Sequence, residues 1–457
     1  MRKNLTIAAI LLFALLAYLP TIHFALVYDD QDQIVANRRL TAWSFVPGYF
    51  TTQLWAHEPW ASPIYFRPIF LLWLRFVYAT LGPPGDLWHW SSIVAHLLAT
   101  ACVLLLILRL TGNFGGAALA AALFAIHPIQ TEAVAWVSSS GDLILTSLVV
   151  LSVYLYARRK GSVSWLSIVF ATLAMFTKEA GIVVVALIFA YEWIQSDWKK
   201  AAVATSPYGL PVLLYLAVRA NALGGLIGPA YPMMSVGAMV LTWPRILAAY
   251  GLHFIWPVHL SVIYDVAASV TILPLLLLIA VVASVGWLVR GSCANVRFGV
   301  AWFAIALAPA LAIRYITPSD FIHDRYLYLP SVGLALLAAT WFSRIRVTRV
   351  GWVVLCILAL ALGWQTRANL RIWQNDITLF TRALETAPSN LSAKNNLAYA
   401  YLNAHRPQDA FPLLQELIQI EPGAMNVNYN MGRYYQQVGN SDAANYYFSI
   451  AEQFYRH

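Results

Sequence analysis

The sequence predicts an all-α fold, a polytopic membrane protein with about 11 transmembrane helices followed by a C-terminal module of helical repeats. Hydrophobic residues make up 60% of the 457 residues and charged residues only 11%, whereas a soluble domain carries about 25% charged residues. Uncharged apolar runs that suit the thickness of a bilayer recur along the chain. The segment 366–457 breaks this pattern and repeats with a fixed period.

This composition excludes a soluble globular enzyme and a disordered protein, because the mean hydropathy is +0.65. Cys102, Cys293 and Cys356 lie far apart, in or beside apolar runs, which argues against a disulfide framework or a zinc site. The net charge is +9, and segment 366–457 is neutral, so the excess lies in the membrane part. The charge therefore indicates orientation by the positive-inside rule and argues against a nucleic-acid partner.

The first span is expected at Leu5–Leu19, directly after Arg2 and Lys3. A signal peptide is the alternative, but no small-x-small site precedes the polar cluster that follows, which favours an uncleaved span. With the N-terminus inside, a long outer loop extends over about 23–86. Its segment Arg67–Leu81 is amphipathic and is expected to lie in the interface rather than to cross.

Apolar runs predict the later spans. They lie at 87–109, 114–127, 142–157, 163–178, 181–195, 203–218, 267–289, 298–313, 326–342 and 350–365. Basic residues then mark the inner ends, at Arg109, Arg158–Lys160 and Lys199–Lys200.

The segment 245–264 contains Pro257 and two histidines and is read as re-entrant or interfacial. If it does not cross, 13 of the 22 Lys and Arg residues before residue 366 lie inside; if it crosses, ten do. The positive-inside rule favours the first option, which gives eleven spans and places the C-terminal segment outside.

The sequence predicts a membrane domain over 1–365 and a repeat domain over 366–457. Pro388 recurs as Pro422, 34 residues later, and several apolar or small residues match at the same offset. This is the tetratricopeptide period, and such repeats form concave peptide-binding surfaces. The alternative is a packing lid on the membrane domain.

Asp29 and Asp30 follow the first span. A carboxylate near a membrane has a raised pKa and can accept the proton of a hydroxyl, and a pair of carboxylates can hold a metal. The alternative is a solvated loop end.

Other ionisable residues lie at span ends on the predicted outer side. Lys178 and Glu179 form one such boundary, where the alternative to function is a simple interfacial pair. Arg325 suits a lipid phosphate, because a guanidinium binds phosphate bidentately. Arg67 is a second candidate for the same role. The alternative for Arg325 is a snorkelling anchor at the membrane interface. Further candidates for the site are His127, Glu132, Asp142 and Asp324. An acid pair and several cations on one membrane face fit a transferase with a lipid-phosphate donor.

Four segments occur in a fixed order, before the repeats. They are Val27-Tyr28-Asp29-Asp30, His127-Pro128 with Thr131–Val134, Lys178-Glu179-x-Gly181, and Asp324–Ser331. This set resembles the transmembrane-and-tetratricopeptide-repeat O-mannosyltransferases and their bacterial relatives, which belong to the GT-C glycosyltransferase superfamily. The resemblance implies a GT-C fold with an outer-facing cavity and a polyprenyl-phosphate sugar donor. It also implies transfer to an acceptor hydroxyl with inversion, with Asp29 as the base and Asp30 as its neighbour.

The expected protein is therefore a hexosyltransferase of the inner (cytoplasmic) membrane, with its site and repeats on the outer, periplasmic side. The donor phosphate is expected on Arg325, helped by Lys178 or Arg67, and the acceptor is a protein Ser or Thr that the repeats could bind. A divalent metal, Mg²⁺ or Mn²⁺, at Asp29 or Asp30 is neither required nor excluded. The alternatives are a glycan or lipid acceptor, and a non-catalytic flippase or assembly scaffold whose repeats recruit partners.

Overall fold

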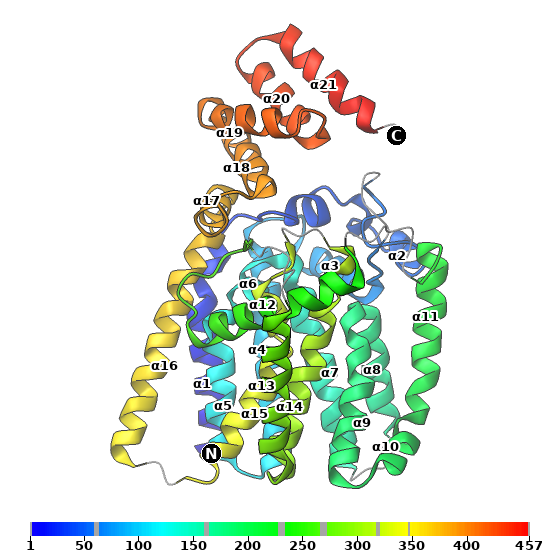
Figure 1. The fold of residues 1–457 in the computed structure, drawn as a ribbon, viewed down its shortest axis with the longest axis vertical. Coiled ribbons are helices and arrows are strands. Elements are labelled where there is room, and N and C mark those ends of the chain that lie inside the picture. The colour runs from blue at the N-terminus through cyan, green and yellow to red at the C-terminus, as the bar shows by residue number, and fades with distance from the viewer. Residues whose placement is uncertain are drawn as a thin grey trace.

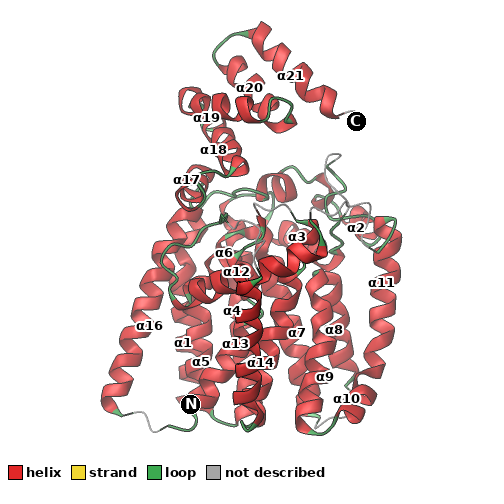
Figure 2. Ribbon diagram, viewed as in Figure 1, coloured by secondary structure: helices red, strands yellow, loops and turns green. Residues whose placement is uncertain are grey.

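A computed structural model describes residues 2–58, 64–159, 164–226, 234–265, 272–316, 320–345 and 348–455. Within these ranges the chain forms helices, turns and loops, and no β-strand (Figure 2). Five residues of the predicted outer loop, 59–63, lie outside the described ranges, as does Lys160 of the second basic cluster. The prediction of an all-helical protein is confirmed.

Most of the helices run side by side as one bundle (Figure 1). They are α1 (Arg2–Tyr18), α4 (His89–Thr111), α5 (Phe114–Ile126), α7 (Ser140–Arg158), α8 (Trp165–Thr177), α9 (Val183–Gln195), α11 (Gly209–Leu223), α13 (Leu273–Arg290), α14 (Ala294–Leu307), α15 (Ser331–Phe342) and α16 (Arg349–Leu370). Short helices join them: α2 (Val46–Tyr49), α3 (Pro68–Leu81), α6 (Thr131–Ala135) and α10 (Trp198–Thr205).

The bundle confirms a multi-pass membrane protein. Among the described residues, eight helical segments are long and apolar enough to cross a membrane, or nine if the bent pair Phe114–Ile126 and Pro128–Ala135 is one span. The prediction of about 11 is not reached on length, because α8, α9 and α15 have only 13, 13 and 12 residues, while α12 (Val236–Ile255), which was not predicted to cross, is among the nine. Each of these three short helices meets a polar segment that folds into a 3₁₀ turn, Glu179–Ile182 between α8 and α9 and Asp324–Leu327 before α15.

The uncertain segment 245–264 is divided in two. Its first part belongs to α12 (Val236–Ile255), which has Pro244 inside the helix, and its second part is a loop. Although α12 is long and apolar enough to span, Figure 1 shows it running across the bundle helices rather than along them. This direction agrees with an interfacial element.

Close packing of α14 on α15 depends on two glycines. A Cβ on Gly333 would lie 2.5 Å from the carbonyl oxygen of Gly299, so only glycine permits this approach. In contrast, none of the residues of α13 is buried, although that helix is apolar over most of its length. The bundle therefore combines tightly packed helices with one that meets few protein neighbours.

Five further helices form what we call the C-terminal helical module. They are α17 (Asp376–Thr386), α18 (Leu391–Asn403), α19 (Pro407–Ile420), α20 (Met425–Gln437) and α21 (Ser441–Tyr455). The first residue of α20 follows the first residue of α18 by 34 positions, and the same distance separates the first residues of α19 and α21. The two helix pairs thus follow the period read from the sequence. Their assignment as tetratricopeptide repeats stays a prediction. The predicted domain boundary between residues 365 and 366 falls within α16 and also stays a prediction.

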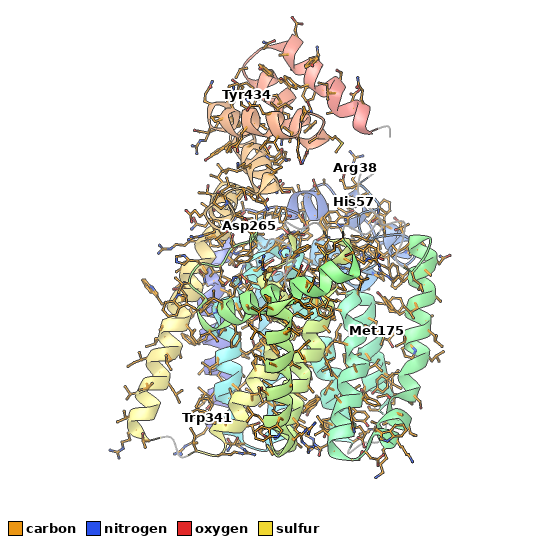
Figure 3. The ribbon with its side chains drawn as sticks, in the orientation of Figure 1. Arg38, His57, Met175, Asp265, Trp341 and Tyr434 are labelled. Atoms are coloured by element: carbon orange, nitrogen blue, oxygen red, sulfur yellow. The ribbon has the colours of Figure 1, made fainter. Side chains whose placement is uncertain are left out.

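The module and the N-terminus lie at opposite ends of the molecule. Figure 3 shows Tyr434 in the module, Asp265 on a loop beneath it, and Trp341 at the far end of the bundle near the N-terminus. We call the end of the bundle next to the module the module end.

Candidate active site

One cavity gathers residues from five distant segments of the chain, with about 650 Å³ of space including its open mouth. Its lining is mostly polar and aromatic. The residues are Tyr28, Asp29, Gln33, Leu54, Trp55, Tyr65, Arg67, Trp136, Ser138, Ser139, Asp142, Lys178, Asp320, His323, Arg325 and Tyr326. The cavity therefore brings together Asp29, the three cations expected to bind phosphate, and Asp142.

The two acids of the pair differ in their surroundings. Asp30 is fully buried, and its carboxylate accepts hydrogen bonds from the Ser138 N–H (2.7 Å), the Ser138 hydroxyl (2.5 Å) and the Val27 N–H (3.2 Å). Asp29 lines the cavity, and among the described residues none hydrogen-bonds to its carboxylate. Asp30 thus anchors the loop, whereas Asp29 is available to a ligand.

Burial raises the pKa of the Asp29 carboxyl to about 6, and the Arg325 guanidinium opposes that rise. A carboxylate with this pKa is ionised near neutral pH and is a better proton acceptor than an ordinary aspartate.

Each of the three cations already has a carboxylate partner, as buried charges require. Lys178 donates to both oxygens of Asp142 (2.6 and 2.8 Å). The Arg67 Nε lies 2.9 Å from Glu179, and the Arg325 Nη1 lies 2.5 Å from Glu132. Their side chains remain 11–19% exposed, so they keep access to the cavity.

The structure does not show an ion pair between Lys178 and Glu179, which was the alternative expected for these two residues. Glu179 instead lies between two arginines, because Arg219 of α11 also contacts it at 3.3 Å. Two guanidinium groups share one carboxylate here, which leaves one positive charge in excess. Arg219 was missed by the sequence analysis, since a single arginine at a span end resembles a snorkelling anchor.

Gly181 fixes the turn that carries Lys178 and Glu179. A Cβ at this position would lie 2.2 Å from the Ala174 carbonyl oxygen at the end of α8. We expect Gly181→Ala to displace this turn and to destabilise the protein by about 1–3 kcal/mol, as overpacking does. Thermal unfolding measures this effect. Gly286→Ala is the control, because nothing lies within 4 Å of its Cβ; equal melting temperatures of the two variants would contradict the prediction.

His323 is a fourth cation beside Arg325. It is buried between Glu132 (3.1 Å) and Asp320 (2.8 Å). Burial and Arg325 act to lower the pKa of His323, but Asp320 and Glu132 outweigh them and raise it to about 9. The Arg325 guanidinium also lies over the Trp136 ring at 4.5 Å. These contacts hold Arg325 in one orientation at the cavity wall.

Five of the predicted site residues are absent from the cavity lining: Asp30, Glu132 and Glu179, whose partners are given above, and Asp324 and His127. Asp324 is buried and accepts hydrogen bonds from His253 Nδ1 (2.9 Å) and the Tyr264 hydroxyl (2.6 Å), so it ties Arg325 to the loop after α12. His127 stacks on Phe254 with ring centroids 4.4 Å apart and is absent from the cavity lining. Both act in packing around the site rather than in the cavity.

The described residues contain no group of three or more His, Cys, Asp and Glu side chains that could hold a metal ion. A metal at Asp29 or Asp30 was neither required nor excluded by the sequence; in the structure the Asp30 carboxylate is occupied by Ser138 and Val27, and of the two acids Asp29 alone faces the cavity.

No protein-family model matches the chain. The resemblance noted in the sequence is confirmed by curated relatives. Protein O-mannosyl-transferase TMTC3 of Mus musculus is 22% identical over 93% of this chain, and TMTC3 of Homo sapiens is 23% identical over the same share. Protein O-mannosyl-transferase F38B6.6 of Caenorhabditis elegans is 23% identical over 92% of this chain.

The chain spans about half the length of the TMTC3 relatives, 52%, and 63% of the C. elegans relative. Among solved structures, ArnT from Cupriavidus metallidurans bound to undecaprenyl phosphate is similar with 15% identity and a TM-score of 0.38, covering 98% of this chain and 76% of that one. This level of structural similarity is too low to assign a fold. The similarity to the protein O-mannosyl-transferases, by contrast, extends over nearly the whole of this chain.

Proposed function

We propose that this protein is a membrane glycosyltransferase that moves a sugar from a polyprenyl-phosphate donor to an acceptor hydroxyl, with a protein Ser or Thr as the acceptor. The observation that carries the proposal is the free Asp29 carboxylate in one cavity with Arg67, Lys178 and Arg325. A proton acceptor and a set of cations are what transfer from a sugar phosphate needs. The similarity to protein O-mannosyl-transferases supports the same reaction class.

In the proposed reaction, Asp29 accepts the proton of the acceptor hydroxyl while its oxygen attacks the anomeric carbon. The bond from that carbon to the donor phosphate oxygen breaks, and the polyprenyl phosphate leaves with the electron pair. Arg67, Lys178 and Arg325 stabilise the charge that develops on this phosphate. A single displacement of this kind inverts the configuration at the anomeric carbon.

The proposal places the reaction on the outer, periplasmic face of an inner membrane. The cavity belongs to the module end of the bundle, opposite the N-terminus, and the positive-inside rule puts the N-terminus inside (Figure 1). The C-terminal helical module then lies on the same side as the cavity, where it could hold a polypeptide acceptor.

The test is turnover by the purified protein in lipid vesicles. Polyprenyl-phosphate mannose and glucose are offered with Ser- and Thr-containing peptides, with and without Mg²⁺ or Mn²⁺, and products are identified by mass. A hexose added to a peptide supports the proposal. Transfer to a glycan or lipid only would change the acceptor class, and no Asp29-dependent transfer from any donor would favour the scaffold or flippase alternative.

The pH dependence of turnover follows from two groups in the cavity. Asp29 must be ionised, and burial raises its pKa to about 6, so activity is lost as the pH falls below that value. Lys178 must be protonated; burial lowers its pKa to about 8, against the opposing effect of Asp142, so activity falls above that value. We expect a bell-shaped profile of kcat/KM with limbs near these values. An acid limb near pH 4 would show that the base is a solvated carboxylate.

A further inference from the structure

The first helix of the C-terminal helical module touches the loop that carries Asp29. At the start of α17, the Asp376 Oδ1 accepts a hydrogen bond from the Tyr28 N–H at 2.8 Å, and the preceding Gln374 carbonyl accepts one from the Ala25 N–H at 3.0 Å. One turn further along α17, the Phe380 ring meets the Tyr28 ring edge-on, with centroids 5.5 Å apart. These contacts join segments about 350 residues apart in the sequence.

Tyr28 has the left-handed backbone conformation, with φ of +55°. For a bulky residue this conformation is unfavourable and persists only where the surroundings enforce it. Here the Asp376 carboxylate holds the Tyr28 N–H, while the Tyr28 ring is stacked on Trp136 at 5.3 Å and is met by Phe380. Because Asp29 is the next residue, this enforced turn decides where its carboxylate points.

The other end of α17 reaches the opposite part of the site. The Thr386 hydroxyl lies 2.9 Å from the Ile263 carbonyl oxygen, and the neighbouring Tyr264 hydroxyl donates to Asp324 at 2.6 Å. Arg325 follows Asp324 in the chain. Ser389, just beyond α17, contacts Asp265, the residue beneath the module in Figure 3. The helix α17 therefore contacts the loop that carries Asp29 directly, and it reaches the loop that carries Arg325 only through the segment of Ile263 and Tyr264.

We propose that Asp376 is a positioning residue that holds the Tyr28–Asp29 turn and thereby couples the C-terminal helical module to the proposed base. This inference rests on the proposed function, because it assigns the effect of Asp376 to the placement of Asp29. It adds a role for the module besides acceptor binding, since α17 holds the turn that carries the proposed base.

The test compares four variants of the full chain in the turnover assay. Asp376→Ala removes the acceptor of the Tyr28 N–H, whereas Asp376→Asn keeps an oxygen there. Glu385→Ala is the matched control, because Glu385 lies on the same helix and, within the described ranges, forms an ion pair only with Arg382 at the surface. Asp29→Asn reports on the base itself. Each variant is also assayed for donor KM and melting temperature.

We expect Asp376→Ala to lower kcat about ten- to a hundredfold, as misplacement of a reacting group does, with donor KM unchanged. Asp376→Asn should keep kcat within about threefold of the wild type, and Glu385→Ala should match the wild type. Should Asp376→Ala fail to fold, Phe380→Leu takes its place, because it removes the ring edge against Tyr28 but stays apolar; kcat should again fall at unchanged donor KM.

Wild-type kcat in the folded Asp376→Ala or Phe380→Leu variant, with Asp29→Asn inactive, would overturn the positioning role and leave the proposed function intact. Wild-type kcat in Asp29→Asn would overturn the proposed base and this inference together. A loss of activity in Glu385→Ala equal to that in Asp376→Ala would also overturn it, because the effect would then belong to α17 as a whole.

Discussion

Asp29→Asn is expected to lower turnover by about 10²–10⁴-fold, the usual loss when a general base is removed. The amide matches the carboxylate in size but cannot accept the acceptor proton. Since no described residue hydrogen-bonds to the Asp29 carboxylate, the substitution breaks no hydrogen bond of the described chain, and because burial disfavours the charged carboxylate, stability should not fall. Donor turnover and donor binding, measured on the same purified variant, separate the chemical step from binding.

Asp30→Asn is the comparison that makes this prediction specific. The Asp30 carboxylate accepts two hydrogen bonds from Ser138 and one from the Val27 N–H. In Asp30→Asn, the new side-chain amide nitrogen is itself a donor and would face one of these donors without an acceptor. We expect Asp30→Asn to destabilise the protein and to lower kcat in proportion to the loss of folded protein. If Asp30→Asn were the inactive variant at full stability while Asp29→Asn turned over normally, the roles given to the two acids would be reversed.

Arg325→Ala is expected to have the second large effect, on stability and on donor use together. It would leave the buried Glu132 carboxylate without its arginine, and breaking a buried ion pair costs about 3–5 kcal/mol. The double variant Arg325→Ala with Glu132→Gln removes both charges, so it should recover much of the lost stability while donor binding stays weak. Chemical denaturation and donor binding are the two measurements.

Arg382→Ala is the control for this prediction, because the Arg382–Glu385 pair is exposed and such pairs contribute little. Arg325→Lys should restore donor binding only in part, because an ammonium group cannot form the bidentate contact of a guanidinium with phosphate. Full donor binding in the double variant would remove Arg325 from the phosphate site and leave Arg67 and Lys178 as its cations.

The helices could be predicted from the sequence because apolar runs are a local property of the chain. Their ends could not be placed as well. The prediction began a span at 326, whereas α15 begins at Ser331 and is preceded by the turn Asp324–Leu327. That turn is held by the hydrogen bonds of Asp324 to His253 and Tyr264, which are tertiary contacts. Where a span meets the site, hydropathy therefore gave the helix but not its length.

Residues adjacent in the sequence also have different partners in the folded protein, and the sequence does not reveal those partners. Asp29 and Asp30 are adjacent, but Asp30 is bound to Ser138, 108 residues away, and only Asp29 faces the cavity. Asp324 and Arg325 are adjacent as well, and only Arg325 lines the cavity. Motif reading could find the segments, since each supplies at least one residue near the cavity. It could not assign residues within a segment, because their partners come from distant helices.

The helix α13 has a consequence for handling the protein. It has 18 residues, which at 1.5 Å per residue gives about 27 Å, close to the hydrocarbon thickness of a bilayer. Because none of its residues is buried, most of its apolar side chains are expected to face lipid tails rather than other helices. Detergent micelles replace that environment during extraction, so α13 is the part of the bundle whose position depends most on the choice of amphiphile. Nanodiscs of matched acyl length are accordingly the preparation in which its native placement is retained.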